Sequence, residues 1–258
     1  MQLKSLGYRA DLAFPGLFGE IIDRGAYQVV RTPDIPTFFM GNFLLFADPP
    51  ASDDFERWRA LFRSEFEGIP GVGHEVFGWD SPEGELGETA PFEAAGFAVL
   101  QTAIMTTRDA VQPPHCNDEV QIQPASSDAD WDDALLCESG FTAAAANPRI
   151  AARLASYRQM ARNREGAWYN AYLNGHLVGG LGIYRVGRTG VIDSVSTHPE
   201  FRRRGVARTE VYHAARHARN NLAIAGLLLG CDEDSAAQRL YEALGFRPVQ
   251  KQVGLLKV

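Results

Sequence analysis

The sequence has little cysteine, no long apolar run and no excess of positive charge. Its three cysteines, Cys116, Cys137 and Cys231, form no Cys-x-x-Cys pair and no disulfide framework. No apolar run approaches the length of a transmembrane helix, and residues 1–7 lack the apolar core of a signal peptide. We therefore expect a cytoplasmic protein without a membrane partner. The formal net charge of −7 argues against a broad nucleic-acid-binding face, and the six histidines show no metal-ligand spacing.

The composition that is present describes a globular protein of one large domain or two smaller ones. Hydrophobic residues make up 45% of the 258 positions and charged residues 22%. Residues 1–117 hold 8 Lys and Arg against 17 Asp and Glu, whereas the remainder holds 17 against 15. This asymmetry indicates two units. The acidic half could attract a cationic amine, or its surface could simply be solvated.

The segment from Val191 to Ala207 carries the strongest functional signal. Residues 191–197 are expected to form a strand, and a basic turn with one glycine then opens a helix. Free main-chain amides and the helix dipole make such a turn an anion site. The turn has the form Arg-x-x-Gly-x-Ala and resembles the pyrophosphate loop of the GNAT family of N-acetyltransferases, which hold acetyl-CoA in this way. The alternative is an ordinary turn whose arginines are solvated.

The order of expected elements in the second half extends the resemblance. A strand at 120–123, helices at 129–137 and 148–164, and a hairpin of 168–173 with 176–184 precede the Val191 strand. Asn174-Gly175 is the dipeptide of a type I′ hairpin turn. A helix at 206–220, a strand at 225–231, a helix at 235–244 and a final strand complete the pattern. Ser235 and Gln238 are expected to form the capping box of the helix at 235–244. The order β-α-α-β-β-β-loop-α-β-α-β is that of a GNAT unit.

The first half resembles a degenerate second copy. Phe92-Glu93-Ala94-Ala95-Gly96-Phe97 matches Tyr241-Glu242-Ala243-Leu244-Gly245-Phe246, and each closes a helix before a β-rich run. Residues 38–46 are expected to form a buried strand, followed by a helix from Asp53 with a capping box of Asp53 and Glu56. We expect an α/β protein of two GNAT-like units, each a mixed, mostly antiparallel sheet flanked by helices. The boundaries are 1–110, a linker at 111–118, and 119–258.

Only the second half is expected to bind the cofactor. The corresponding turn of the first half, residues 47–52, contains Pro49 and Pro50, which lack amide donors, and Asp48, which is negative. The counterpart of Tyr241 is Phe92, which has no proton to give. The first half is therefore expected to shape the substrate cleft or to serve as structural support.

The resemblance to the GNAT family implies a set of site residues. Tyr241 matches the general acid that protonates the leaving thiolate, although its helical spacing also fits a core position. Asp193 could relay a proton from the amine, or could be a hydrogen-bonded strand carboxylate. Asp234 stands where many relatives carry an asparagine that contacts the cofactor. The residues expected to bind the cofactor are Val195, Ser196, Thr197, Arg202, Arg203, Arg204, Gly205, Val206, Ala207, Asp234 and Ser235.

The expected activity is acetyl transfer from acetyl-CoA to a primary amine of a small molecule or peptide, by direct attack on the thioester. The alternative is a CoA-binding module without transferase activity, and a third reading is a ligand-free scaffold. The loop from Ser139 to Asn147 is expected to help choose the acceptor. The sequence leaves the acceptor and the oligomeric state, including a homodimer, open.

Overall fold

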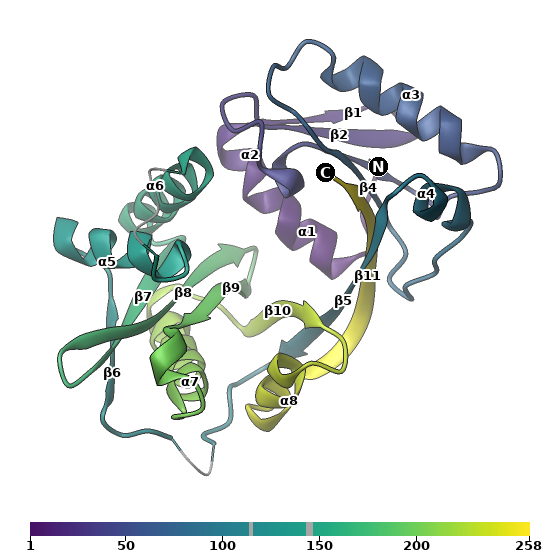
Figure 1. The fold of residues 1–258 in the computed structure, drawn as a ribbon. Helices are drawn as coiled ribbons and strands as arrows, with labels where there is room; N and C mark the ends of the chain where they lie inside the picture. The colour runs from purple at the N-terminus through teal and green to yellow at the C-terminus, as the bar shows by residue number, and fades with distance from the viewer. Residues whose placement is uncertain (114–115, 143–146) are drawn as a thin grey trace. The chain divides into compact units, whose positions relative to one another are not determined.

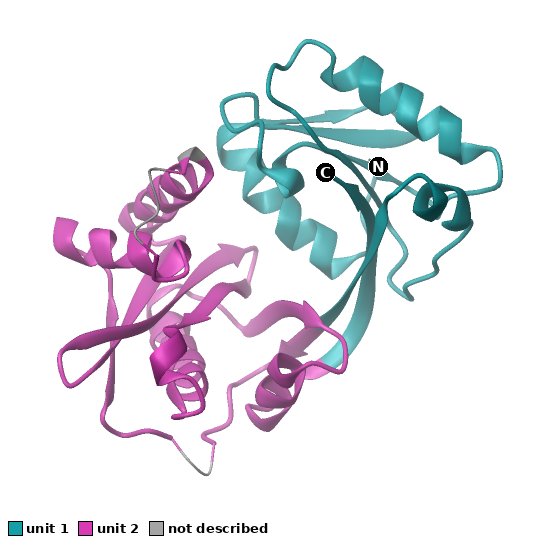
Figure 2. Cartoon of the chain, viewed as in Figure 1, with its two compact units in different colours: residues 1–104, 248–258 teal, residues 105–247 magenta. Residues whose placement is uncertain are grey.

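The computed structural model describes residues 1–113, 116–142 and 147–258 (Figure 1). By their contacts these residues form two compact units (Figure 2). Unit 1 comprises residues 1–104 and 248–258, and unit 2 comprises residues 105–247. Residues 114–115 of the expected linker and 143–146 of the expected acceptor loop lie outside the described residues.

Unit 1 is a mixed sheet with helices packed on it. Its strands lie in the order β1-β2-β3-β4-β11-β5. The neighbouring pairs β1–β2, β2–β3 and β4–β11 are antiparallel, and β3–β4 is parallel. The bounds are α1 Leu6–Ala13, α2 Pro15–Phe18, β1 Glu20–Asp23, β2 Tyr27–Arg31, the 3-10 helix η1 Phe39–Gly41, β3 Phe43–Phe46, α3 Asp54–Phe66, β4 Glu75–Trp79, α4 Ala90–Ala94, β5 Ala98–Thr107 and β11 Arg247–Lys257.

Unit 2 is also a mixed sheet, in the order β10-β9-β8-β7-β6. Strands β6 to β9 pair antiparallel, and β10 runs parallel to β9. Helices α5 and α6 lie on one face and α7 on the other (Figure 1). The bounds are β6 Val120–Pro124, α5 Asp128–Glu138, α6 Pro148–Asn163, β7 Gly166–Leu173, β8 His176–Val186, β9 Thr189–Thr197, the 3-10 helix η2 Pro199–Phe201, α7 Val206–Asn221, β10 Gly226–Asp232 and α8 Ala236–Ala243.

Aromatic side chains form the core of unit 1. Trp58, Phe62 and Phe66 recur every four residues on α3, so one face of the helix is buried. The Trp58 ring stacks on Phe46, with centroids 3.8 Å apart and planes within 4°. Phe92 lies 5.7 Å from Trp58 and has no exposed surface. Phe92, which the sequence match aligns with Tyr241, is therefore a packing residue of this core.

Small residues pack α7 onto its sheet. Val211, Ala214, Ala215 and Ala218 are each at most 2% exposed, as their helical spacing predicts. Alanines let the helix backbone approach the strands closely, and α7 contacts both β8 and β9. Because α7 begins at Val206, this packing also fixes the basic turn before it.

The expected fold class is confirmed: the structure is mixed α/β, with helices flanking a mixed sheet in each unit. The expected helices and strands of the second half are all present within a few residues, and Asn174 and Gly175 both have positive φ, as a type I′ turn requires. None of the helices in the described part of the chain combines the length and apolarity needed to cross a bilayer.

Two local details differ from the expectation. Residues 38–46 are not one strand, because residues 39–41 form η1 and only 43–46 form β3. Asp53 is the N-cap residue of α3, but its side chain makes no capping hydrogen bond. Asp54 instead accepts from the Ala51 amide at 2.8 Å, so the carboxylate that serves this turn comes from the next residue.

The division of the chain also differs from the boundary at 119–258. Residues 248–258 group with unit 1 because β11 pairs with β4, with Gly254 opposite Gly78 and Leu255 opposite Phe77. The partner of β11 lies far away in the sequence, so the strand sequence of β11 itself does not indicate which strand it pairs with. Both units nevertheless share one motif: β2-β3-α3-β4 and β8-β9-α7-β10 each contain an antiparallel pair, a helix and a strand parallel to the one before the helix.

Candidate functional site

The turn between β9 and α7 leaves main-chain amides without a side-chain cap. After β9, the His198 ring accepts from the Glu200 amide at 3.3 Å and starts η2. Arg203 and Gly205 then adopt positive φ, +62° and +79°. Gly205 is the N-cap residue of α7, and no side chain caps this helix. The first-turn amides and the positive end of the dipole therefore face a place where an anion is favoured.

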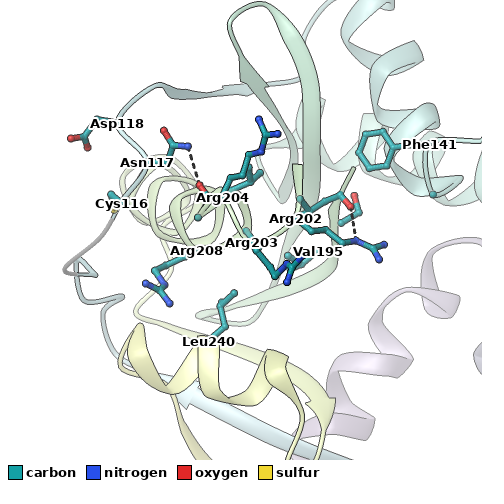
Figure 3. A pocket seen from close by; sticks show the side chains of 16 residues that line it. Cys116, Asn117, Asp118, Phe141, Val195, Arg202, Arg203, Arg204, Arg208 and Leu240 are labelled. Carbon is teal, nitrogen blue, oxygen red and sulfur yellow. Dashed lines mark hydrogen bonds between the residues drawn. The ribbon is translucent and has the colours of Figure 1, made fainter. Parts of the chain in front are cut away.

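A cavity of about 940 Å³ adjoins this turn (Figure 3). Nine of the residues expected to bind a cofactor line it, and they come from β9, the turn or the first residues of α7. Seven further lining residues were not expected from the sequence. The lining is formed by Cys116, Asn117, Asp118, Gly140, Phe141, Val195, Ser196, Thr197, Arg202, Arg203, Arg204, Gly205, Val206, Ala207, Arg208 and Leu240.

Arginines make this cavity positive. Arg202 Nε donates to the Thr197 carbonyl at 3.4 Å, and the Arg204 guanidinium lies over the Phe201 ring at 5.2 Å. Arg203 is exposed. One helical turn further, Arg208 has a buried Nε without a hydrogen-bond partner among the described residues. A buried donor that lacks a partner is costly, so a ligand acceptor here would relieve it.

Strand β9 is irregular beside the cavity. Gly180 of β8 pairs with Ser196, and Gly182 pairs with Asp193, so one residue of β8 faces two of β9. This is a β-bulge, and it places Ser194 at φ +54°. On the other edge, the pairs with β10 end at Val191 and Leu228, although both strands continue. In the described chain the far half of β9 is thus no longer paired with β10.

Tyr241 lies on α8, next to Leu240 of the cavity wall, but does not itself line the cavity. It is 7% exposed, and its ring meets Phe246 edge to face with centroids 6.1 Å apart. Burial, followed by the neighbouring Cys231 and Glu210, raises the pKa of the Tyr241 phenol. The phenol therefore holds its proton at neutral pH. The side chain packs against the core residue Phe246, and its protonated phenol also fits the expected role of a proton donor.

Asp193 is bound by neighbouring side chains. Arg153 of α6 forms an ion pair with its carboxylate, and the Tyr157 hydroxyl donates to the same oxygen at 3.5 Å. Arg153 Nε also lies 3.2 Å from Glu138 Oε1. These contacts fit the second of the two alternatives for Asp193, a hydrogen-bonded carboxylate on a strand.

The structure does not bring Asp234 and Ser235 into the cavity. Ser235 Oγ accepts from the Gln238 amide at 3.1 Å and caps α8, as its spacing predicts. The Asp234 amide donates to Gln238 Oε1 at 2.8 Å, and its carbonyl accepts from Arg239. Both residues therefore hold the start of α8.

Residues of the linker were missed as part of this site. The main-chain amide of Asn117 donates to Thr209 Oγ1 at 2.8 Å. The side-chain Nδ2 of Asn117 donates to the Arg204 carbonyl at 2.9 Å (Figure 3). Asn117 thus ties the linker to the basic turn. A connecting segment carries no periodicity or motif, so nothing in the sequence marked it. Arg208 could have been found, because it lies within the first turn of the predicted helix.

Comparison with known proteins identifies the type of this domain. The model of the acetyltransferase (GNAT) family matches residues 131–246, which include the bulge, the basic turn and α8.

The chain contains a GNAT domain. No curated protein matches the sequence. A functionally unknown conserved protein from Staphylococcus epidermidis has a similar solved structure, with TM-score 0.73, 16% identity, and coverage of 93% of this chain and 94% of that one. A GCN5-related N-acetyltransferase from Kribbella flavida has TM-score 0.67 and 15% identity, with coverage of 98% of this chain and 96% of that one. A tandem GNAT protein from the clavulanic acid biosynthesis pathway has TM-score 0.55 and 13% identity, with coverage of 100% of this chain and 89% of that one. At these identities the likeness describes the fold.

Proposed function

We propose that the protein is an acetyl-CoA-dependent N-acetyltransferase that acetylates a primary amine of a small molecule or peptide. The observation that carries the proposal is the uncapped start of α7 at Gly205, which opens into an arginine-lined cavity of about 940 Å³ within the GNAT domain. The charge and the free donors fit a pyrophosphate, and the buried Arg208 Nε fits a further acceptor. The free cysteines accord with a cytoplasmic location, which is part of the same proposal.

The residues of the cavity divide the work of binding in this proposal. Amides of the turn from Arg203 to Ala207 hold the pyrophosphate, and the side chains of Arg202, Arg203 and Arg204 add a positive field. The main chain of β9 from Val195 to Thr197, no longer paired with β10, holds the pantetheine arm and supplies an N–H to the developing oxyanion. Bound acetyl-CoA supplies the activated acetyl group.

Two residues have proposed roles in proton transfer. Tyr241 donates its proton to the leaving thiolate, since its raised pKa keeps the phenol protonated. Asp193 accepts a proton from the amine through water, with Arg153 keeping its carboxylate in place. Asp234 and Ser235 contribute indirectly in this proposal, because they fix the beginning of α8 and hence Tyr241.

The first half is proposed to be a degenerate GNAT copy without a cofactor site. The shared β-β-α-β motif supports the relation between the halves. In the turn of the first half, the Ala51 amide already binds the Asp54 carboxylate, and the Pro50 carbonyl accepts from the Glu88 amide at 2.7 Å. A ligand anion would find no free donor at Ala51.

Calorimetric titration with CoA tests the cofactor site. We expect one site per chain, and Gly205→Glu should abolish binding because it adds bulk and negative charge at the anion site. Gly187→Glu is the matched control: Gly187 also has positive φ, +61°, but no cavity-lining role. Retention of CoA binding by Gly205→Glu, or its equal loss in Gly187→Glu, would contradict the assignment.

A CoA-binding module without transferase activity is the second candidate function. The contact set of Asp193 favours it, because the carboxylate proposed as the base is already bound by Arg153 and Tyr157. Release of thiol from acetyl-CoA, measured over a panel of primary amines, separates the two. Turnover with any amine supports the transferase, whereas CoA binding without turnover supports the module.

A further inference from the structure

The β9 bulge contains a residue in a strained conformation. Ser194 and Val195 together face the single residue Leu181 of β8. Ser194 has φ +54°, which a residue with a Cβ rarely adopts. Val195 follows directly, lines the cavity, and has no pairing partner on β8 among the described residues. The direction of the Val195 main chain therefore depends on how firmly the bulge is held.

One arginine of another element binds both residues that precede Val195. Arg153 of α6 donates from Nη2 to the Asp193 carboxylate and to Ser194 Oγ, the latter at 2.9 Å. Its Nε lies 3.2 Å from Glu138 Oε1 at the end of α5. The Arg153 side chain is 17% exposed and that of Glu138 is 10% exposed. The guanidinium fork thus links the bulge to both helices of this face.

We propose that Arg153 is a positioning residue that holds the β9 bulge and so aims the Val195 main chain into the cavity. This inference rests on the proposed acetyl transfer, in which that main chain contacts the reacting thioester. A strained residue persists where several contacts fix its conformation. Arg153 supplies such contacts to the bulge from helix α6. In this role it acts through the strand and does not touch the substrate, although it also pairs with the Asp193 carboxylate.

The fork geometry distinguishes this role from simple charge pairing. A lysine at position 153 keeps the positive charge between Glu138 and Asp193, but it offers a single ammonium in place of a planar fork. Arg158 provides a matched control, because it lies on the same helix and pairs with Asp128 of α5 at the surface. Arg158→Lys makes the same exchange away from the bulge.

Steady-state kinetics with acetyl-CoA test the role. Arg153→Lys should lower kcat roughly ten- to a hundredfold, because small misplacements of reacting groups cost that much. The KM for acetyl-CoA and the Kd for CoA should change far less than kcat, because the contacts of the basic turn with the pyrophosphate are kept. Arg158→Lys should leave all three values unchanged. Unchanged kcat in Arg153→Lys, or an equal loss in Arg158→Lys, would overturn the inference.

A second substitution separates the bulge from the charge of Asp193. Ser194→Gly places at the strained position a residue that adopts positive φ without a steric penalty. If Arg153 acts by holding the bulge, the loss caused by Arg153→Lys should be much smaller in the Ser194→Gly background. An equal loss in both backgrounds would mean that Arg153 acts through the Asp193 carboxylate, and would refute this inference.

Amide hydrogen exchange provides a readout that does not need turnover. In Arg153→Lys, the amides of residues 194–196 should exchange faster than in the parent protein, whereas Arg158→Lys should leave them unchanged. If the parent protein shows no turnover, the proposed acetyl transfer is refuted. Hydrogen exchange would then still test whether Arg153 holds the β9 bulge. Unchanged exchange at residues 194–196 in Arg153→Lys would overturn the inference whether or not the protein is an enzyme.

Discussion

Glu210 is a buried carboxyl whose removal should stabilise the protein in a pH-dependent way. It lies on the sheet-facing side of α7 with no exposed surface, and neither carboxyl oxygen has a hydrogen-bond partner in the described structure. A Cβ placed at Gly179 of β8 would lie only 2.8 Å from Glu210 Oε2, so the carboxyl is packed against the strand. Burial raises the pKa of Glu210 well above the ordinary value of 4.5. At pH values between 4.5 and this raised pKa, the folded protein therefore holds Glu210 protonated.

The direction and size of the effect follow from proton linkage. Below the unfolded-state pKa, both states carry the proton and the carboxyl contributes no pH-dependent term. As the pH rises from there toward the raised folded-state pKa, the unfolded state releases the proton and the folded state does not. Within this window the free energy of unfolding falls by about 1.4 kcal/mol per pH unit. Two pH units inside the window thus cost the folded protein about 2.7 kcal/mol.

The isosteric exchange Glu210→Gln removes this penalty. We expect the variant and the parent protein to be close in stability near pH 4. Above the ordinary glutamate pKa, and as far as the raised folded-state pKa of Glu210, the variant should gain about 1.4 kcal/mol for each pH unit. Urea denaturation followed by circular dichroism at each pH measures the difference, in which the other titrating groups cancel. Glu119→Gln, at an exposed position, controls for the loss of one negative charge. A difference for Glu210→Gln that does not change with pH would refute the reasoning.

Two further substitutions test the core and the proposed acid. Trp58→Ala should lower the free energy of unfolding by about 3–5 kcal/mol, because it opens a cavity against Phe46, Phe77 and Phe92; a loss below about 1 kcal/mol in urea denaturation would contradict the packing. Tyr241→Phe should lower kcat about 10²- to 10⁴-fold and leave CoA binding intact, since it removes only the proton donor. Full turnover of Tyr241→Phe with the best amine would exclude Tyr241 as the acid.

Sequence predicted those parts of the fold and of the site that depend on neighbours in the chain. The turn from Arg202 to Ala207 was predicted because glycine, arginines and a following amphipathic helix all occur within twenty residues. The Asn174-Gly175 turn was predicted because the dipeptide itself favours positive φ. The cap of α8 by Ser235 was predicted from the spacing to Gln238. In each case the determining interaction spans a few residues.

The remaining parts depend on partners that are distant in sequence. The pairing of β11 with β4 joins residues more than 170 positions apart, and no local pattern in either strand selects the other. The contact of Asn117 with Arg204 closes the cavity from a segment that reads only as a linker. Arg153 reaches Asp193 across 40 residues, and this contact changes the environment of the carboxylate. Long-range contacts thus decide the surroundings of residues whose identity was visible in the sequence.

The two strand-to-helix turns differ in what already binds their main-chain amides. At the start of α3, the Ala51 amide donates to Asp54, whose side chain is 6% exposed and paired with Arg57, so an internal anion lies at this turn. A ligand anion there would displace a buried carboxylate or lie beside its charge, and both outcomes are unfavourable. At the start of α7, no side chain caps the helix and the adjacent side chains are arginines. The same β-turn-α framework therefore opposes an anion in unit 1 and favours one at Gly205, because the occupant of the first amides differs.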